Sequence, residues 1–138
     1  MKKPSFQNFA GLALAALSVV LMATPASAKI GSCTDPIVFG TTLSETGPFS
    51  TLAGRWRKMT EVFAEEVNKT GGVMVKSCGK KLPLKFVIYD DQSVPATAVA
   101  LYEKMATVDN VDFFVGPDWS SLGGPVPPVA DKHKIPMV

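Results

Sequence analysis

Residues that carry catalysis or bind metals are scarce in this sequence. Its 138 residues include only one histidine and two cysteines, so there is no cluster with the ligand spacing of a zinc site. Neither a Gly-x-Ser-x-Gly elbow, a Gly-x-Gly-x-x-Gly turn nor a phosphate-binding lysine motif occurs. We therefore expect a protein that is not an enzyme and that carries no metal and no cofactor.

An excess of charge is also missing once the first 28 residues are set aside. That segment contains two lysines and no acidic residue, so the remaining 110 residues carry 12 basic and 12 acidic side chains. A net charge of zero gives no electrostatic reason to bind nucleic acid or an anionic membrane surface.

The amino-terminal segment has the three parts of a cleavable signal peptide. Lys2 and Lys3 precede an apolar run over residues 10–23, and Ala26-Ser27-Ala28 provides the small residues that signal peptidase reads. A transmembrane helix is the alternative, but it needs about 20 apolar residues. The pattern predicts a signal peptide over residues 1–28, cleavage before Lys29, and a soluble periplasmic protein.

Export favours a disulfide between the two cysteines, Cys33 and Cys78. Closing a loop of this length is worth roughly 4 kcal/mol in the chain-entropy model. The alternative is lipidation at Cys33, since Ile30-Gly31-Ser32-Cys33 loosely matches a lipobox. Cys33, however, follows the end of the apolar run by 10 residues, whereas a lipidation site should adjoin that run.

Hydrophobic periodicity predicts strands that alternate with helices. Apolar residues at intervals of three or four between Leu52 and Val67 indicate an amphipathic helix, with Ser50 or Thr51 as its cap and Gly71-Gly72 as its stop. The other expected elements are strands at 36–42, 82–89, 111–115 and 135–138 and helices at 95–107 and 122–132, the last with a start made irregular by prolines.

This alternation predicts the α/β class, with a doubly wound parallel sheet. Ligands of such sheets bind beyond the carboxyl ends of the strands, which selects the loops 43–50, 90–93 and 116–121. These loops carry our candidate site residues, Ser44, Thr46, Trp119, Ser120 and Ser121. Hydroxyls at the start of a helix favour a small carboxylate. Alternatively, Ser120 and Ser121 only cap the helix, and Trp119 packs in the core or at a hinge.

Catalytic interpretations find little support. Asp90 and Asp91 are adjacent at the end of a strand and should point to opposite sides, which disfavours a shared acid–base role. His133 stands between two lysines, where we expect a solvated helix end.

Six segments, in this order and spacing, resemble the substrate-binding proteins of branched-chain amino-acid-type ABC importers, the Leu/Ile/Val-binding group. They are 42–48 (TLSETGP), 64–73 (AEEVNKTGGV), 89–93 (YDDQS), 95–99 (PATAV), 111–117 (VDFFVGP) and 129–137 (VADKHKIPM). The resemblance implies the type I periplasmic binding fold, with residues 29–138 as the truncated amino-terminal part of the first of two ligand-binding lobes.

The resemblance also implies a function. Such receptors close on a small solute and deliver it to an ABC permease in the inner membrane, here as a monomer that binds an amino acid or related carboxylate. The position matching Ser120 binds the ligand carboxylate in the family, whereas Trp119 and Leu52 stand where residues vary with the ligand. Val94 replaces a usual aspartate, and Cys78 lies in an insertion. The alternatives are a sensor domain of the same fold and an exported α/β enzyme.

Overall fold

The computed structural model describes residue 33 and residues 36–138, so the expected signal peptide lies outside the described residues. The elements follow one another as β1 (Ile37–Leu43), α1 (Ala53–Lys69), β2 (Val73–Val75), η1 (Lys76–Cys78), β3 (Lys80–Leu82), β4 (Leu84–Asp90), α2 (Pro95–Thr107), β5 (Phe113–Phe114), α3 (Ser120–Gly123) and α4 (Pro127–His133). Among them, no helix combines the length and apolar character needed to cross a membrane.

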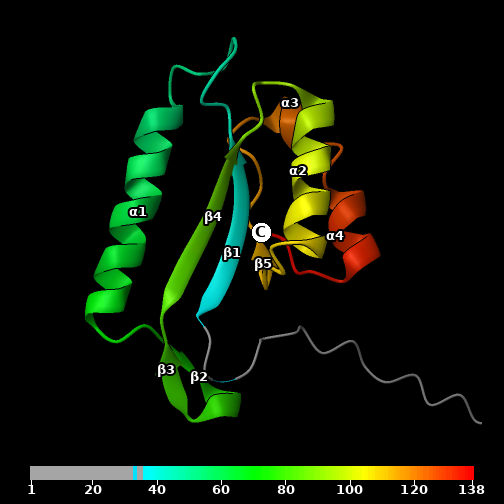
Figure 1. Ribbon diagram of the computed structural model, residues 1–138. Helices are drawn as coiled ribbons and strands as arrows, with labels where there is room; N and C mark the ends of the chain where they lie inside the picture. Colours follow the sequence, from blue (N-terminus) through cyan, green and yellow to red (C-terminus); the bar gives the residue numbers. More distant parts are fainter. Residues whose placement is uncertain (1–32, 34–35) are drawn as a thin grey trace, which may run out of the picture.

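The central sheet is parallel and has the strand order β4-β1-β5. Beyond β5, Met137 forms a parallel bridge with Phe114, where we expected a fourth strand. Helix α1 lies on one face of the sheet, and α2, α3 and α4 lie on the other (Figure 1). The prediction of an α/β doubly wound sheet is therefore confirmed, and its strand order reverses between β1 and β5.

The main core lies between the sheet and the helices on the α2 face. The buried residues there are Ala98, Tyr102, Met105, Val111, Phe114, Val126, Val129 and Ala130. Tyr102 meets Phe114 edge to face, with ring centroids 4.9 Å apart. A Cβ atom at Gly40 would lie 2.7 Å from the Met105 sulfur, so glycine is what lets β1 and α2 approach this closely.

The α1 face of the sheet carries an apolar groove. Phe39 stacks on Phe86 and Phe113, with ring centroids 5.4 and 5.1 Å apart. These rings line a groove of about 620 Å³ that also includes Phe63 and Met74, which are 55% and 56% exposed. Among the described helices, only α1 lies over this face (Figure 1), and residues 73–77 border the groove.

The segment between α1 and β4 forms a small antiparallel hairpin, β2–η1–β3, which the sequence analysis did not predict. Gly72, with a φ of 93°, turns the chain into it. Pro83 separates β3 from β4, and its carbonyl accepts a hydrogen bond from the Ile37 N–H. A disulfide joins Cys78 to Cys33, with the two Cα atoms 5.6 Å apart. The hairpin lies at the amino-terminal end of the sheet (Figure 1).

Helices α1 and α2 confirm the predicted helices to within about a residue, but two local expectations were wrong. The N-cap of α1 is Leu52, with no side-chain cap hydrogen bond, so neither Ser50 nor Thr51 caps the helix. The single helix expected over 122–132 is divided into α3 and α4. The glycines at 123–124 favour a helix poorly, and Pro125 and Pro127 lack the N–H that a continuous helix requires.

Candidate functional site

The loops after β1, β4 and β5 come together at the carboxyl-terminal end of the sheet, opposite the hairpin (Figure 1). Polar side chains from the loops after β4 and β5 bind the backbone of the loop after β1, so the three loops form one structure. Tyr102 of α2 adds a fourth support, because its hydroxyl donates to the Val115 carbonyl just after β5. Burial raises the pKa of Tyr102 to about 12, so this donor keeps its proton at any physiological pH.

Asp90, at the end of β4, fixes the loop that follows β1. Its Oδ1 accepts hydrogen bonds from the N–H groups of Glu45, Thr46 and Gln92 at 3.0, 3.2 and 2.8 Å. Its Oδ2 accepts the Thr46 hydroxyl at 2.7 Å. Burial alone would raise the pKa of Asp90, but the hydrogen bonds from Thr46, Gln92 and Glu45 outweigh it, and the pKa is lowered. Asp90 is thus a structural carboxylate.

Asp91 points into the protein and meets Ser44. The Ser44 hydroxyl donates to Asp91 Oδ1 at 2.7 Å, and both side chains are fully buried. The Ser44 N–H donates to Asp118 Oδ1 at 3.4 Å, from the loop after β5. The expectation that Ser44 contacts the ligand is therefore corrected, because a buried hydroxyl bound to a carboxylate is not available to a solute. Asp90 and Asp91 have separate partners, as their opposite orientation predicted.

The carboxyl group of Asp118 lies in an environment that disfavours its charged form. Burial raises its pKa, and the nearby charge of Asp91 raises it further, while the Ser44 hydrogen bonds partly offset the change. The second carboxyl oxygen of Asp118 is buried and has no hydrogen-bond partner among the described residues, and the same holds for Asp91 Oδ2. The loop after β5 is therefore held close to β1 at an electrostatic cost.

Trp119 joins the first and third loops. Its indole N–H donates to the Phe49 carbonyl at 3.1 Å, and its ring stacks on the Phe49 ring with centroids 4.9 Å apart. The side chain is half-buried. Sequence reasoning identified Trp119 but missed Phe49, since no pattern links two residues 70 positions apart.

Ser120 and Ser121 follow Trp119 and are exposed. They are the first two residues of α3, whose N-cap is Trp119, so neither serine is the N-cap. Helix α3 has only four residues, and a single turn provides little of the macrodipole on which the expectation of an anion site partly rested. The two exposed hydroxyls remain as donors at the carboxyl end of β5.

A basic side chain that reaches the first loop, that of Arg57, is already paired. Arg57 Nη2 donates to Glu45 Oε2 at 2.9 Å, and the Nε of Arg57 binds the other oxygen of the same carboxylate. The hydrogen bond to Glu45 raises the pKa of Arg57 despite partial burial. An anionic group near Ser120 would therefore be met by neutral donors and not by this guanidinium.

A cavity of about 270 Å³ lies on the α1 side of the same loops. Thr41, Leu43 and Trp56 line it together with Thr60, Phe86 and residues 115–118. It adjoins the site through Asp118 but opens on the face that carries the apolar groove, since Thr41 and Leu43 alternate with Thr42 and Ser44 along β1.

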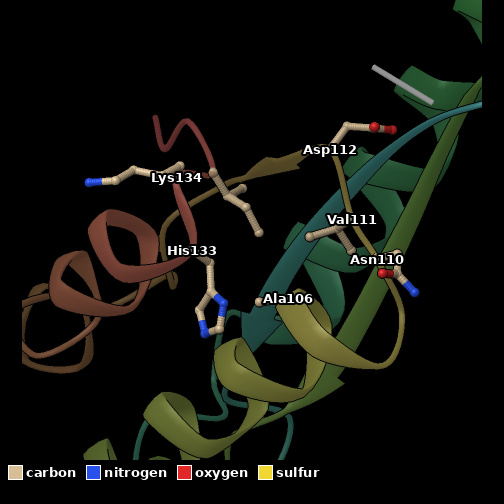
Figure 2. A pocket seen from close by; sticks show the side chains of 7 residues that line it. Ala106, Asn110, Val111, Asp112, His133 and Lys134 are labelled. Atoms are coloured by element: carbon tan, nitrogen blue, oxygen red, sulfur yellow. The ribbon is translucent and has the colours of Figure 1, made fainter. Parts of the chain in front are cut away.

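A second cavity, of about 190 Å³, lies between the ends of α2 and α4 (Figure 2). The His133 ring is directed toward α2, whereas Lys134 extends away (Figure 2). His133 Nε2 lies 2.6 Å from Glu103 Oε2, and Lys132 Nζ lies 2.8 Å from Glu103 Oε1. His133 therefore ties α4 to α2, which corrects the expectation of a solvated helix end. No group of three or more potential ligands in the described part of the chain could hold a metal ion.

These features define a class of protein. A doubly wound sheet whose loops at the switch point present exposed hydroxyls and an aromatic ring is typical of a domain that binds a small molecule. Residues 36–138 match the family model described as "Periplasmic binding protein". The chain therefore belongs to the periplasmic binding protein family.

Solved structures share the fold. The chain is similar to the branched-chain amino acid transporter substrate binding protein LivJ from Streptococcus pneumoniae, solved with isoleucine, at 24% identity and a TM-score of 0.65, covering 75% of this chain and 28% of that one. It is also similar to a possible leucine/isoleucine/valine-binding protein from Rhodopirellula baltica, at 22% identity and a TM-score of 0.63, covering 83% of this chain and 28% of that one. A third similar structure is that of the leucine binding protein LivK from Thermotoga maritima, at 19% identity and a TM-score of 0.61, covering 73% of this chain and 26% of that one. The chain thus spans little more than a quarter of these proteins.

Proposed function

We propose that the chain forms part of the first ligand-binding lobe of an extracytoplasmic solute receptor. The receptor acts in the periplasm as a monomer and delivers a small amino acid or related carboxylate to an ABC permease. Membership of the periplasmic binding protein family supports this function. The neighbours whose names include branched-chain amino acids support the choice of ligand class.

The observation that carries the proposal is the position of Ser120. Its exposed hydroxyl follows β5 at the switch point of the sheet, directly beside Trp119. In our proposal Ser120 donates to the ligand carboxylate, Ser121 makes a weaker contact, and Trp119 borders the apolar part of the ligand. Thr46 is exposed in the first loop, and in our proposal it borders the entrance to the ligand site. Ser44 contributes indirectly, through its hydrogen bonds with Asp91 and Asp118.

Calorimetric titration of the complete protein tests this assignment. The panel consists of L-isoleucine, L-leucine, L-phenylalanine, benzoate, acetamide and urea. A hydrogen bond to a charged group is worth about 1.5 to 3 kcal/mol, so Ser120→Ala should weaken carboxylate binding roughly 10- to 150-fold. Ser121→Ala should weaken it less.

The matched control is Ser77→Ala, which removes an exposed hydroxyl in η1 at the opposite end of the sheet. It should leave affinity unchanged. Binding of uncharged amides alone, with no response to Ser120→Ala, would show that the carboxylate assignment is wrong.

A further inference from the structure

Phe49 occupies a position between two loops that come from distant parts of the sequence. Its N–H donates to Ser93 Oγ at 3.1 Å, and its carbonyl accepts the Trp119 indole N–H at 3.1 Å. Ser93 Oγ in turn donates to the Thr46 carbonyl at 2.8 Å. The backbone of Phe49 is therefore held from both sides, by the loop after β4 and by the loop after β5.

The side chain of Phe49 is held as well. Its ring stacks on Trp119 with an interplanar angle of 28°, and both residues are half-buried. Stacked aromatic rings are rigid contact surfaces with few rotatable bonds, so little entropy is lost when a ligand lies against them. The two rings thus form one apolar surface, which we call the Phe49–Trp119 wall.

The hydrogen bonding of Trp119 limits what this wall can do. The only donor of its side chain is the indole N–H, and that group already binds the Phe49 carbonyl. The wall therefore offers a ligand ring surface but no donor. The exposed hydroxyl of Ser120 follows immediately in the chain. An apolar surface beside a neutral donor fits a molecule with a carboxylate at one end and a ring at the other.

We propose that Phe49 is a specificity-determining residue, which with Trp119 selects carboxylates that carry an aromatic group over aliphatic ones of similar size. This inference rests on the proposed function, because it takes Ser120 as the partner of the carboxylate. Aromatic pairs gain about 0.5 to 1.5 kcal/mol beyond their buried area, which corresponds to roughly 2- to 12-fold in affinity.

The experiment measures the affinity of the complete protein for L-phenylalanine and for L-leucine. Phe49→Leu should lower the ratio of the two affinities roughly 2- to 12-fold, because leucine keeps apolar volume but lacks a ring. Trp119→Phe keeps a ring but removes the N–H that places Phe49, so it should lower the ratio too. The double variant should lose less than the sum of the two single variants, since both act on one wall.

Two controls separate this inference from the proposed function. Phe63→Leu makes the same change at a partly exposed position of α1 that lines the apolar groove, and it should leave the ratio unchanged. Ser120→Ala should weaken both ligands alike, because both carry a carboxylate. A ratio that is unchanged in Phe49→Leu, with or without a lower melting temperature, would reduce Phe49 to a structural role and overturn the inference. Failure of the unaltered protein to bind any carboxylate of the calorimetric panel would overturn both the proposed function and the inference.

Discussion

The disulfide between Cys33 and Cys78 allows stability and binding to be tested separately. It closes a loop with a sequence separation of 45. Cys78 packs against a buried cluster that includes Ile37 and Leu84, the first residues of β1 and β4. The loops that carry the candidate site begin at the other ends of these strands. Removing the disulfide should therefore destabilise the lobe and leave ligand affinity unchanged.

The size of the effect follows from the loop length. In the chain-entropy model a loop of about 45 residues is worth roughly 4 kcal/mol at 25 °C. That corresponds to roughly a thousandfold change in the unfolding equilibrium. Residual structure in the reduced, unfolded chain would make the measured loss smaller. Replacement of both cysteines by serine leaves no unpaired thiol that could form an alternative bond.

Urea unfolding of the complete protein, with and without a reductant, measures the loss. The unaltered protein should unfold at lower urea after reduction and alkylation, whereas the double serine variant should unfold at the same urea concentration in both conditions. Titration with L-leucine and L-phenylalanine should give the same affinities for both proteins. An unchanged midpoint after reduction would refute the stabilising role, and a loss of affinity would refute the separation of the disulfide from the site.

Three further predictions concern the loops and the apolar groove. Burial raises the pKa of Asp118, so the contribution of Asp118 to stability should fall as pH rises from its ordinary pKa of 3.8 through the raised value. Asp118→Asn keeps an acceptor for the Ser44 N–H and should flatten this part of the pH profile of stability. Identical urea midpoints of the two proteins at each pH would contradict the reasoning. Asp90→Ala removes the three hydrogen bonds that fix the first loop, and a fourth from the Gln92 N–H. It should weaken ligand binding roughly tenfold while circular dichroism stays unchanged, and an unaltered affinity would show that the loop needs no such anchor. Residues 29–138 expressed alone should bind the dye ANS at the groove of about 620 Å³ and should bind little ligand. Cooperative unfolding together with micromolar ligand binding would show that this part of the protein suffices for a stable site.

The sequence was most informative where structure depends on neighbouring residues. The periodic apolar positions of α1, the proline that begins α2 and the glycines after Lys69 each act within one or two turns of backbone, so these elements were predicted closely. The alternation of strands and helices then fixed the parallel topology, because right-handed crossovers leave few other arrangements. The three loops at the carboxyl ends of the strands followed from that topology.

The sequence was less informative about the shortest strands. The β2–β3 hairpin consists of strands of three residues each, too short for a pattern of alternation to emerge. The strand predicted at 111–115 is reduced to Phe113–Phe114. Its neighbour Asp112 accepts the Val38 N–H with a side-chain oxygen at 2.8 Å, in place of a backbone carbonyl. Whether a side-chain oxygen replaces a backbone carbonyl as the acceptor depends on where that side chain lies in three dimensions.

By itself, the sequence determined the class of fold, the alternation of the main strands and helices and the loops in which a ligand site could form, because these depend on local propensity and chain topology. Only the tertiary structure decided the role of each polar or aromatic residue within those loops. Ser44 and Ser120 have the same side chain, yet one is buried on Asp91 and the other is exposed. Phe49 meets Trp119 across 70 positions. Burial and long-range pairing depend on the packing of the whole lobe, and no short stretch of sequence encodes them.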